Sequence, residues 1–565
     1  MQAHREMQPE KSADLVLTDG FVYTVDDQAT TAQAVAVRAG AIVYVGTNGE
    51  AKGYIGPNTQ VLDLGGRLVL PGFIDSHAHA SSAVKMLYEV QLWGLASLRA
   101  YLDAISEFVL AHPEAEFILG SGWDPIVLGG GGPLKGELDS IESQRPMAMM
   151  DLSGHSLWVN SKALELARID GERPDPPSGG IIDRLPGTVG TPGNTYGEPS
   201  GTLRFPADRL VTDALPPYTA AHYRAGIEWF QENVGGPLGI TAAFDAFLQI
   251  GGGEAEAYEE LARDGGLTMW VRGAFELKPE DDLPEWLSTA VAVRQRHVSP
   301  LFEPTAVKFM ADGVLEGRTA FLKENYADEP GFRGAPLWPP TLMAEAFAAV
   351  DRAGLQIHVH GLGDAACAEA LDSLECVGRT NGPRDRRPGI THLEYVDPAD
   401  IPRFADLSVT AVVQPYWAVK NSYYSAVALP TLGAERADHQ YPIRSFFDAG
   451  ALVASSSDWY VTIPPDPLDG IQSGVLRWLQ GESEVDDPLW PEERCTVPQM
   501  IRSFTIDGAR ANFLEGVTGS IETGKSADLI VLDTNILECD PAEIGGGKVL
   551  LTLFRGSEVY RDVEF

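Results

Sequence analysis

The chain of 565 residues carries a formal net charge of −38, and 44% of its residues are hydrophobic. This length exceeds one compact core and predicts two or three structural units, while the apolar content excludes a largely disordered protein. An acidic surface of this size repels phosphate backbones and anionic membranes, so we expect neither nucleic acid nor a membrane as a partner.

The cysteines and the N-terminal segment indicate a cytoplasmic protein. The four cysteines are scattered, and no two of them form a CxxC pair, which argues against a disulfide framework. The first residues contain no apolar segment typical of a signal peptide, and no run of about 18 apolar residues is long enough to span a bilayer.

The two ends of the chain have the same β-rich texture. Six short strands separated by turn residues are expected within residues 1–70, and three more within 508–565. Neither end has enough strands to close a core alone, so we expect both to form one small β-sandwich. Two independent β modules are the alternative.

Residues 71–507 alternate strand-like runs with amphipathic stretches, which is typical of a parallel sheet with crossover helices. Thr341–Ala353 and Ala365–Cys376 are two of the expected helices. Eight strands are expected, the number that a (β/α)8 TIM barrel requires. They are Phe73–His77, Ile240–Asp245, Trp270–Phe275, Ala306–Met310, Gln356–His360, Gly389–Glu394, Val409–Gln414 and Leu452–Ser457.

The stretch from about residue 80 to 239 is too long for one crossover after the first strand. We expect it to form an inserted subdomain that covers the barrel mouth. It contains a strand-like run at Glu116–Gly120 and a glycine-rich loop at Gly129–Gly132.

Metal-capable side chains stand at the ends of five of the eight strands. Chemistry in such barrels occurs at the C-terminal ends of the strands. Residues two apart on a strand point the same way, so both imidazoles of the first strand can reach one point. Each residue alone has a structural interpretation, but their shared position favours a metal site. The set comprises His77, His79, Lys308, His360, His392 and Asp458.

Imidazole and carboxylate ligands suit zinc best, with manganese, iron or nickel as alternatives. Lys308, if buried in the barrel, has a lowered pKa, and its neutral amine can add carbon dioxide to form a carbamate that bridges two metals. The alternative is a charged lysine paired with substrate or with Glu316.

The segment Leu70-Pro71-Gly72-Phe73-Ile74-Asp75-Ser76-His77-Ala78-His79 resembles the signature opening of the amidohydrolase superfamily. Further motifs resemble its YtcJ-like and N-substituted formamide deformylase-like (amidohydrolase 3) branch, and the resemblance extends from about Asp14 to Tyr560. These motifs are Gly122-Trp123-Asp124, Ser153-Gly154-His155-Ser156 with Asn160, Val307–Gly313, His360–Asp364, His392-Leu393-Glu394, Gln414-Pro415 and Ser457-Asp458-Trp459.

The resemblance implies a centre of one or two metal ions. His77, His79 and Asp458 would bind the more buried ion, His360 and His392 the second, and carbamylated Lys308 would bridge them. His358 shares a strand face with His360 and is a rival ligand or a supporting group.

The expected reaction is hydrolysis of a carbon–nitrogen bond in a small amide, such as an N-substituted formamide or an N-acyl amine. Metal-activated hydroxide would attack the carbonyl, and Asp458 would carry the proton to the leaving nitrogen. His155 would help to stabilise the oxyanion or, alternatively, hold its own turn. The other candidates for contact with this small-molecule substrate, each with a structural alternative, are Trp123, Asp312, Arg318 and Gln414.

Two other functions fit the same residues. The alternative substrate is a cyclic amide, a carbamate or an ester, since the metal site suits all of them. A non-catalytic barrel protein is the third hypothesis, against which the presence of all six ligand types argues. A homodimer is the commonest assembly for such a chain.

Overall fold

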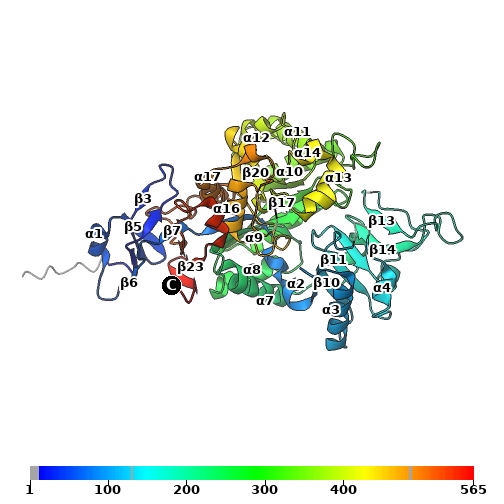
Figure 1. The fold of residues 1–565 in the computed structure, drawn as a ribbon, viewed down its shortest axis with the longest axis horizontal. Coiled ribbons are helices and arrows are strands. Elements are labelled where there is room, and N and C mark those ends of the chain that lie inside the picture. Colours follow the sequence, from blue (N-terminus) through cyan, green and yellow to red (C-terminus); the bar gives the residue numbers. More distant parts are fainter. Residues whose placement is uncertain (1–11, 129–131, 178, 482, 484–485) are drawn as a thin grey trace, which may run out of the picture.

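Three structural parts follow one another across the molecule: a β-sandwich, a barrel and an inserted subdomain (Figure 1). The computed structural model describes residues 12–128, 132–177, 179–481, 483 and 486–565. The chain starts in the sandwich, passes into the barrel, leaves it for the insert, and returns to complete the barrel and then the sandwich.

Eight parallel strands form the barrel sheet, and their spatial order follows the sequence from β8 to β21. The ends of this sheet meet through a backbone hydrogen bond, which Asp458 N donates to His77 O at 2.8 Å. The predicted (β/α)8 barrel is therefore confirmed. The strands are β8 (Phe73–Ala78), β15 (Ile240–Leu248), β16 (Trp270–Glu276), β17 (Phe302–Met310), β18 (Gln356–Gly361), β19 (Gly389–His392), β20 (Thr410–Val413) and β21 (Leu452–Ser455).

Helices cover the outside of the barrel. Because both faces of the strands are buried, the strands read as nearly continuous apolar runs, whereas the helices keep one apolar stripe. The Asp282 side chain caps the N-terminus of α9 by accepting from Glu285 N at 3.0 Å. The main helices are α8 (Glu254–Asp264), α9 (Leu283–Arg296), α10 (Pro340–Arg352), α11 (Asp364–Asn381), α12 (Ile401–Asp406), α15 (Ile443–Asp448), α16 (Pro467–Leu476), α17 (Val497–Ser503) and α18 (Ile506–Ala511).

Strands from both ends of the chain share one sheet of the sandwich. The C-terminal strand β22 pairs antiparallel with β7, so that Leu532 lies opposite Leu68. Apolar side chains from both ends form one core, among them Val35, Val69 and Val531. The sheets are β5-β4-β1-β6 and β24-β23-β22-β7-β2-β3, built from β1 (Leu15–Thr18), β2 (Phe21–Tyr23), β3 (Thr31–Ala32), β4 (Ala34–Arg38), β5 (Ala41–Gly46), β6 (Gln60–Asp63), β7 (Leu68–Pro71), β22 (Leu529–Leu532), β23 (Val549–Phe554) and β24 (Ser557–Arg561).

The insert contains its own six-stranded sheet, in the order β13-β14-β12-β11-β10-β9. The glycine-rich loop expected at Gly129–Gly132 lies, except for Gly132, outside the described residues. The elements are α2 (Val84–Tyr88), β9 (Val90–Gln91), α3 (Leu98–Ala111), β10 (Ile118–Trp123), α4 (Lys135–Asp139), β11 (Met147–Asp151), β12 (Ser156–Val159), α5 (Ser161–Leu166), β13 (Ile181–Arg184), β14 (Pro199–Arg204), α6 (Arg209–Thr212) and α7 (Ala220–Phe230).

Within the described part of the chain, none of the helices combines the length and the apolar character needed to cross a membrane.

Candidate metal centre

His77, His79 and Asp458 bring one ligand atom each to within 4.8 Å of one another. Asp458 Oδ1 lies 3.3 Å from His77 Nε2 and 3.0 Å from His79 Nε2. His77 lies in β8, His79 is the first residue after that strand, and Asp458 follows the last barrel strand. Two imidazoles and a carboxylate that converge in this way form a donor set that suits zinc.

The backbone at this site adopts unusual conformations. Asp458 has φ 53° and His392 has φ 77°, both in the left-handed region that side chains other than glycine rarely occupy. Such strain requires surrounding contacts that hold it in place, and it is common at functional sites.

His360 and His392 lie beside the first three residues. Their ring centroids are 4.4 Å apart, and His392 Nδ1 is 3.9 Å from Asp458 Oδ2. His360 Nε2 donates to Gly313 O at 3.1 Å, so its Nδ1 carries the free lone pair. Burial, reinforced by neighbouring positive groups, holds the pKa of both histidines well below the ordinary value. Both rings are therefore neutral, the form that binds metals.

His358 lies behind His77 and does not compete with His360. The distance from His358 Nε2 to His77 Nδ1 is 2.7 Å, within hydrogen-bond range. The His358 ring also stacks on the Phe244 ring, with 4.5 Å between centroids. The contact between His358 Nε2 and His77 Nδ1 fixes the orientation of the His77 ring, whose Nε2 faces Asp458.

Lys308 is buried next to the same centre. Its Nζ lies 3.4 Å from His77 Nε2, and no carboxylate among the described residues lies within 4.0 Å of it. Burial lowers the pKa of Lys308 to about 7. Glu316, the expected alternative partner, accepts a hydrogen bond from Tyr423 Oη at 2.9 Å instead.

Asp75 connects the first and last strands of the barrel, although the sequence did not single it out. It lies on the same face of β8 as His77, and its Oδ1 accepts from Ser457 N at 3.0 Å and from His77 N at 3.3 Å. The Ser457 hydroxyl donates to its Oδ2. Asp75 thus orders the backbone on both sides of the metal-binding set. The sequence could have identified Asp75 by its two-residue spacing from His77, which puts both side chains on one face of the strand.

His155 reaches the centre from the insert, with its ring centroid 5.3 Å from that of His360. Its backbone N donates to Asp151 Oδ1 at 2.9 Å, which fixes the turn, but its Nδ1 has no partner in the described structure. Burial and the positive charge of Lys308 lower the pKa of His155 to about 3. The neutral ring can donate one hydrogen bond toward the centre.

All six metal-capable residues and His155 line one cavity of about 630 Å³. The barrel and the insert both contribute walls. A volume of this size suits a small molecule.

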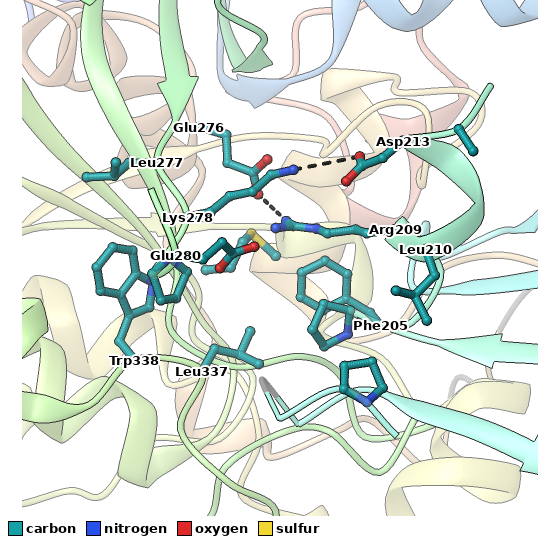
Figure 2. Close-up of a pocket in the computed structure, with 15 residues that line it drawn as sticks. Phe205, Arg209, Leu210, Asp213, Glu276, Leu277, Lys278, Glu280, Leu337 and Trp338 are labelled. Atoms are coloured by element: carbon teal, nitrogen blue, oxygen red, sulfur yellow. Dashed lines mark hydrogen bonds and ion pairs between the residues drawn. The ribbon is translucent and has the colours of Figure 1, made fainter. Parts of the chain in front are cut away.

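A side pocket of about 380 Å³ shares part of this lining (Figure 2). An ion pair between Arg209 of the insert and Glu276 at the end of β16 lies where the two spaces meet, and Lys278 lies 3.7 Å from Asp213 beside it. Leu337 and four other apolar or aromatic side chains form much of the remaining wall shown in the figure; those labelled are Phe205, Leu210, Leu277, Leu337 and Trp338. Glu276 was not predicted, although it is the only charged side chain at the C-terminal end of the third barrel strand.

Trp123 and Gln414, which the sequence offered as substrate contacts or as structural residues, both have partners within the protein. Trp123 Nε1 donates to Met149 O at 2.7 Å inside the insert. Gln414 Nε2 donates to Thr391 Oγ1 at 3.1 Å and to Ser456 Oγ at 2.7 Å between barrel strands. Neither side chain is among the described residues that line the cavity.

Asp312 and Arg318 also lie outside the described lining of the cavity. The Asp312 carboxylate is fully buried and accepts from three backbone N–H groups, two of which belong to Leu362 and Gly363. Arg318 forms an ion pair with Asp328 rather than with Asp312. Both residues therefore order the loops after β17.

Comparison with known proteins agrees with this geometry. The chain is 30% identical to Protein LONG AFTER FAR-RED 3 of Arabidopsis thaliana, with 97% of this chain and 92% of that protein covered. It is 29% identical to the putative amidohydrolase YtcJ of Bacillus subtilis, over 96% of this chain and 98% of the relative. It is 27% identical to the N-substituted formamide deformylase of Arthrobacter pascens, over 96% of this chain and 97% of that protein.

A solved structure shares the fold. An uncharacterized metal-dependent hydrolase from Pyrococcus horikoshii OT3 superimposes with a TM-score of 0.73 at 23% identity, covering 94% of this chain and 99% of the other. The model of the amidohydrolase family matches residues 60–560. Together with the full-length relatives, this match shows that the chain belongs to the amidohydrolase family.

Proposed function

We propose that this protein is a metal-dependent hydrolase that cleaves the carbon–nitrogen bond of a small linear amide. The observation that carries the proposal is the convergence of His77, His79 and Asp458 within 4.8 Å at the mouth of the barrel. The relative named as an N-substituted formamide deformylase supports an N-substituted formamide or a related N-acyl amine as the substrate.

The residues that would hold the metal are those with imidazoles or carboxylates facing the centre. His77, His79 and Asp458 would hold one ion, and His360 and His392 a second. Lys308, whose Nζ lies 3.4 Å from His77 Nε2, would help to hold both ions if it carried a carbamate. A bound zinc ion supplies an acidified water and polarises a carbonyl.

The chain's own groups handle the proton and the developing charge. Asp458 Oδ1, 3.0 Å from His79 Nε2, would accept a proton from the attacking water and pass it to the leaving nitrogen. His155, neutral and close to His360 from the insert, would donate a hydrogen bond to the developing oxyanion. The insert therefore contributes to the chemistry as well as covering the mouth.

Elemental analysis of the purified protein tests the metal. We expect one or two transition-metal ions per chain, and a large loss in His79→Ala. His439→Ala is the matched control, because the exposed His439 side chain lies outside the described cavity lining and its Nδ1 donates to the backbone carbonyl of Glu435 at 2.6 Å. A wild-type protein without stoichiometric transition metal would overturn the proposal.

Substrate assays test the bond that is cleaved. N-formyl and N-acetyl amines should be hydrolysed, and removal of the metal by a chelator should abolish turnover until zinc is restored. A parallel panel of cyclic amides, carbamates and esters separates the alternatives. Faster turnover of that panel would replace the linear amide as the substrate class.

A further inference from the structure

Lys85 is a further lysine in the wall of the cavity, separate from Lys308. It belongs to α2, the first α-helix after His79. Its Nζ donates to Tyr460 Oη at 2.6 Å and lies 4.2 Å from the centroid of the Tyr460 ring. That ring centroid lies 6.1 Å from the centroid of the His79 ring. Because Tyr460 follows Asp458 by two residues, the segments that carry the proposed ligands also position this pair.

The hydrogen-bond donors of this pair outnumber the acceptors around them. A lysine ammonium has three N–H donors, and a tyrosine hydroxyl has one O–H donor. Lys85 gives one N–H to Tyr460, and no carboxylate in the described part of the chain lies within 4.0 Å of its Nζ. Tyr460 Oη accepts from Lys85, and no described group accepts from it. Three donors are therefore free to meet an acceptor in the cavity.

Glu89 is the alternative counter-ion, because it follows Lys85 by four residues. It lies more than 4.0 Å from Lys85 Nζ, and both of its oxygens have neutral partners, Tyr218 Oη and Ser121 Oγ. Burial lowers the pKa of Lys85, but Tyr460 and the charge of Glu89 outweigh this effect and raise it. Lys85 thus stays charged without a direct ion pair.

We propose that Lys85 and Tyr460 form an anion subsite that binds a carboxylate of the substrate. This inference rests on the proposed function, because it names the substrate class of the same cavity. The two oxygens of a carboxylate match the free N–H groups of Lys85 and the O–H group of Tyr460. A single lysine balances one negative charge, whereas a phosphate would call for more cationic donors. The substrate is then an amide that carries a carboxylate away from the scissile bond.

Matched substrate pairs test the subsite. The probes are N-formylglycine, N-formyl-β-alanine and N-formyl-4-aminobutyrate, each beside its primary amide, which has nearly the same shape but no charge. We expect the wild type to favour at least one acid over its amide by about 30-fold in kcat/KM, the effect of charge-assisted hydrogen bonds. Lys85→Met should bring this ratio close to one, while Lys85→Arg should retain part of it.

Lys278→Met is the matched control. Lys278 lines the same cavity, but it lies 3.7 Å from the carboxylate of Asp213. The ratio between acid and amide should therefore persist in this variant. Thermal unfolding of each variant establishes that it is folded.

Calorimetric binding of the same pairs to the zinc-loaded protein separates this inference from the proposed function. Tighter binding of an acid to the wild type than to Lys85→Met, without turnover of any probe, would support the subsite and reject the proposed reaction. The subsite is refuted if the wild type does not prefer any acid in either measurement, or if Lys85→Met keeps the preference.

Discussion

Asp75→Ala tests whether the contact between the first and last strands builds the metal centre. The change leaves two buried backbone N–H groups, those of His77 and Ser457, without their acceptor. Each unsatisfied buried donor costs about 1–3 kcal/mol, so the free energy of unfolding should fall by about 2–6 kcal/mol. Because groups that support metal ligands affect metal binding, zinc affinity should fall by about 10–100-fold.

Asp75→Asn is the control for shape. Its amide oxygen can keep both backbone donors, and the Ser457 hydroxyl can turn to accept from its amide nitrogen. We expect a loss of about 1 kcal/mol, the difference between a charged and a neutral acceptor. Urea titration measures the stability, and competition with a chelator measures the zinc affinity. If Asp75→Ala unfolded and bound zinc like the wild type, the strand contact would have no role in forming the centre.

Two further variants probe the insert. Burial raises the pKa of Asp151 from 3.8 to about 7, so folding favours its protonated form. The stability that this preference adds is full below about pH 4, is lost as the pH rises through 7, and amounts to about 4 kcal/mol. Urea titrations of Asp151→Asn should therefore show a smaller fall in stability between pH 4 and 7 than those of the wild type. An unchanged pH profile would contradict the raised pKa of Asp151. Arg209→Met should cost about 3–5 kcal/mol because it leaves the buried Glu276 carboxylate unpaired, and the double variant with Glu276→Leu should recover most of that loss. Additive effects in that double-mutant cycle would refute the coupling.

The barrel and its candidate ligands could be predicted from the sequence because both follow from strand periodicity. Apolar runs mark the eight strands, and a polar residue that ends such a run is expected near the barrel mouth. The structure accordingly brings His77, Lys308 and Asp458 together.

The turns could not be predicted in the same way, because local sequence does not give the direction of a turn side chain. Asp312 lies two residues after the last residue of β17, yet its carboxylate points to backbone amides of neighbouring loops. Asp75 and Ser457 are 382 positions apart, and only the closed barrel reveals their contact. Similarly, the role of Glu276 could not be predicted, because its ion-pair partner Arg209 comes from the insert.

The junction between sandwich and barrel has a consequence for protein synthesis. β7 ends at Pro71 and β8 begins at Phe73, and between them Gly72 N donates to Asp528 O at 2.9 Å. The strand that carries His77 is thus held at its start by a segment that the ribosome makes after every candidate ligand, Asp458 included. A chain that stops between Asp458 and Asp528 would keep every candidate ligand but lack the acceptor that holds the start of the first barrel strand.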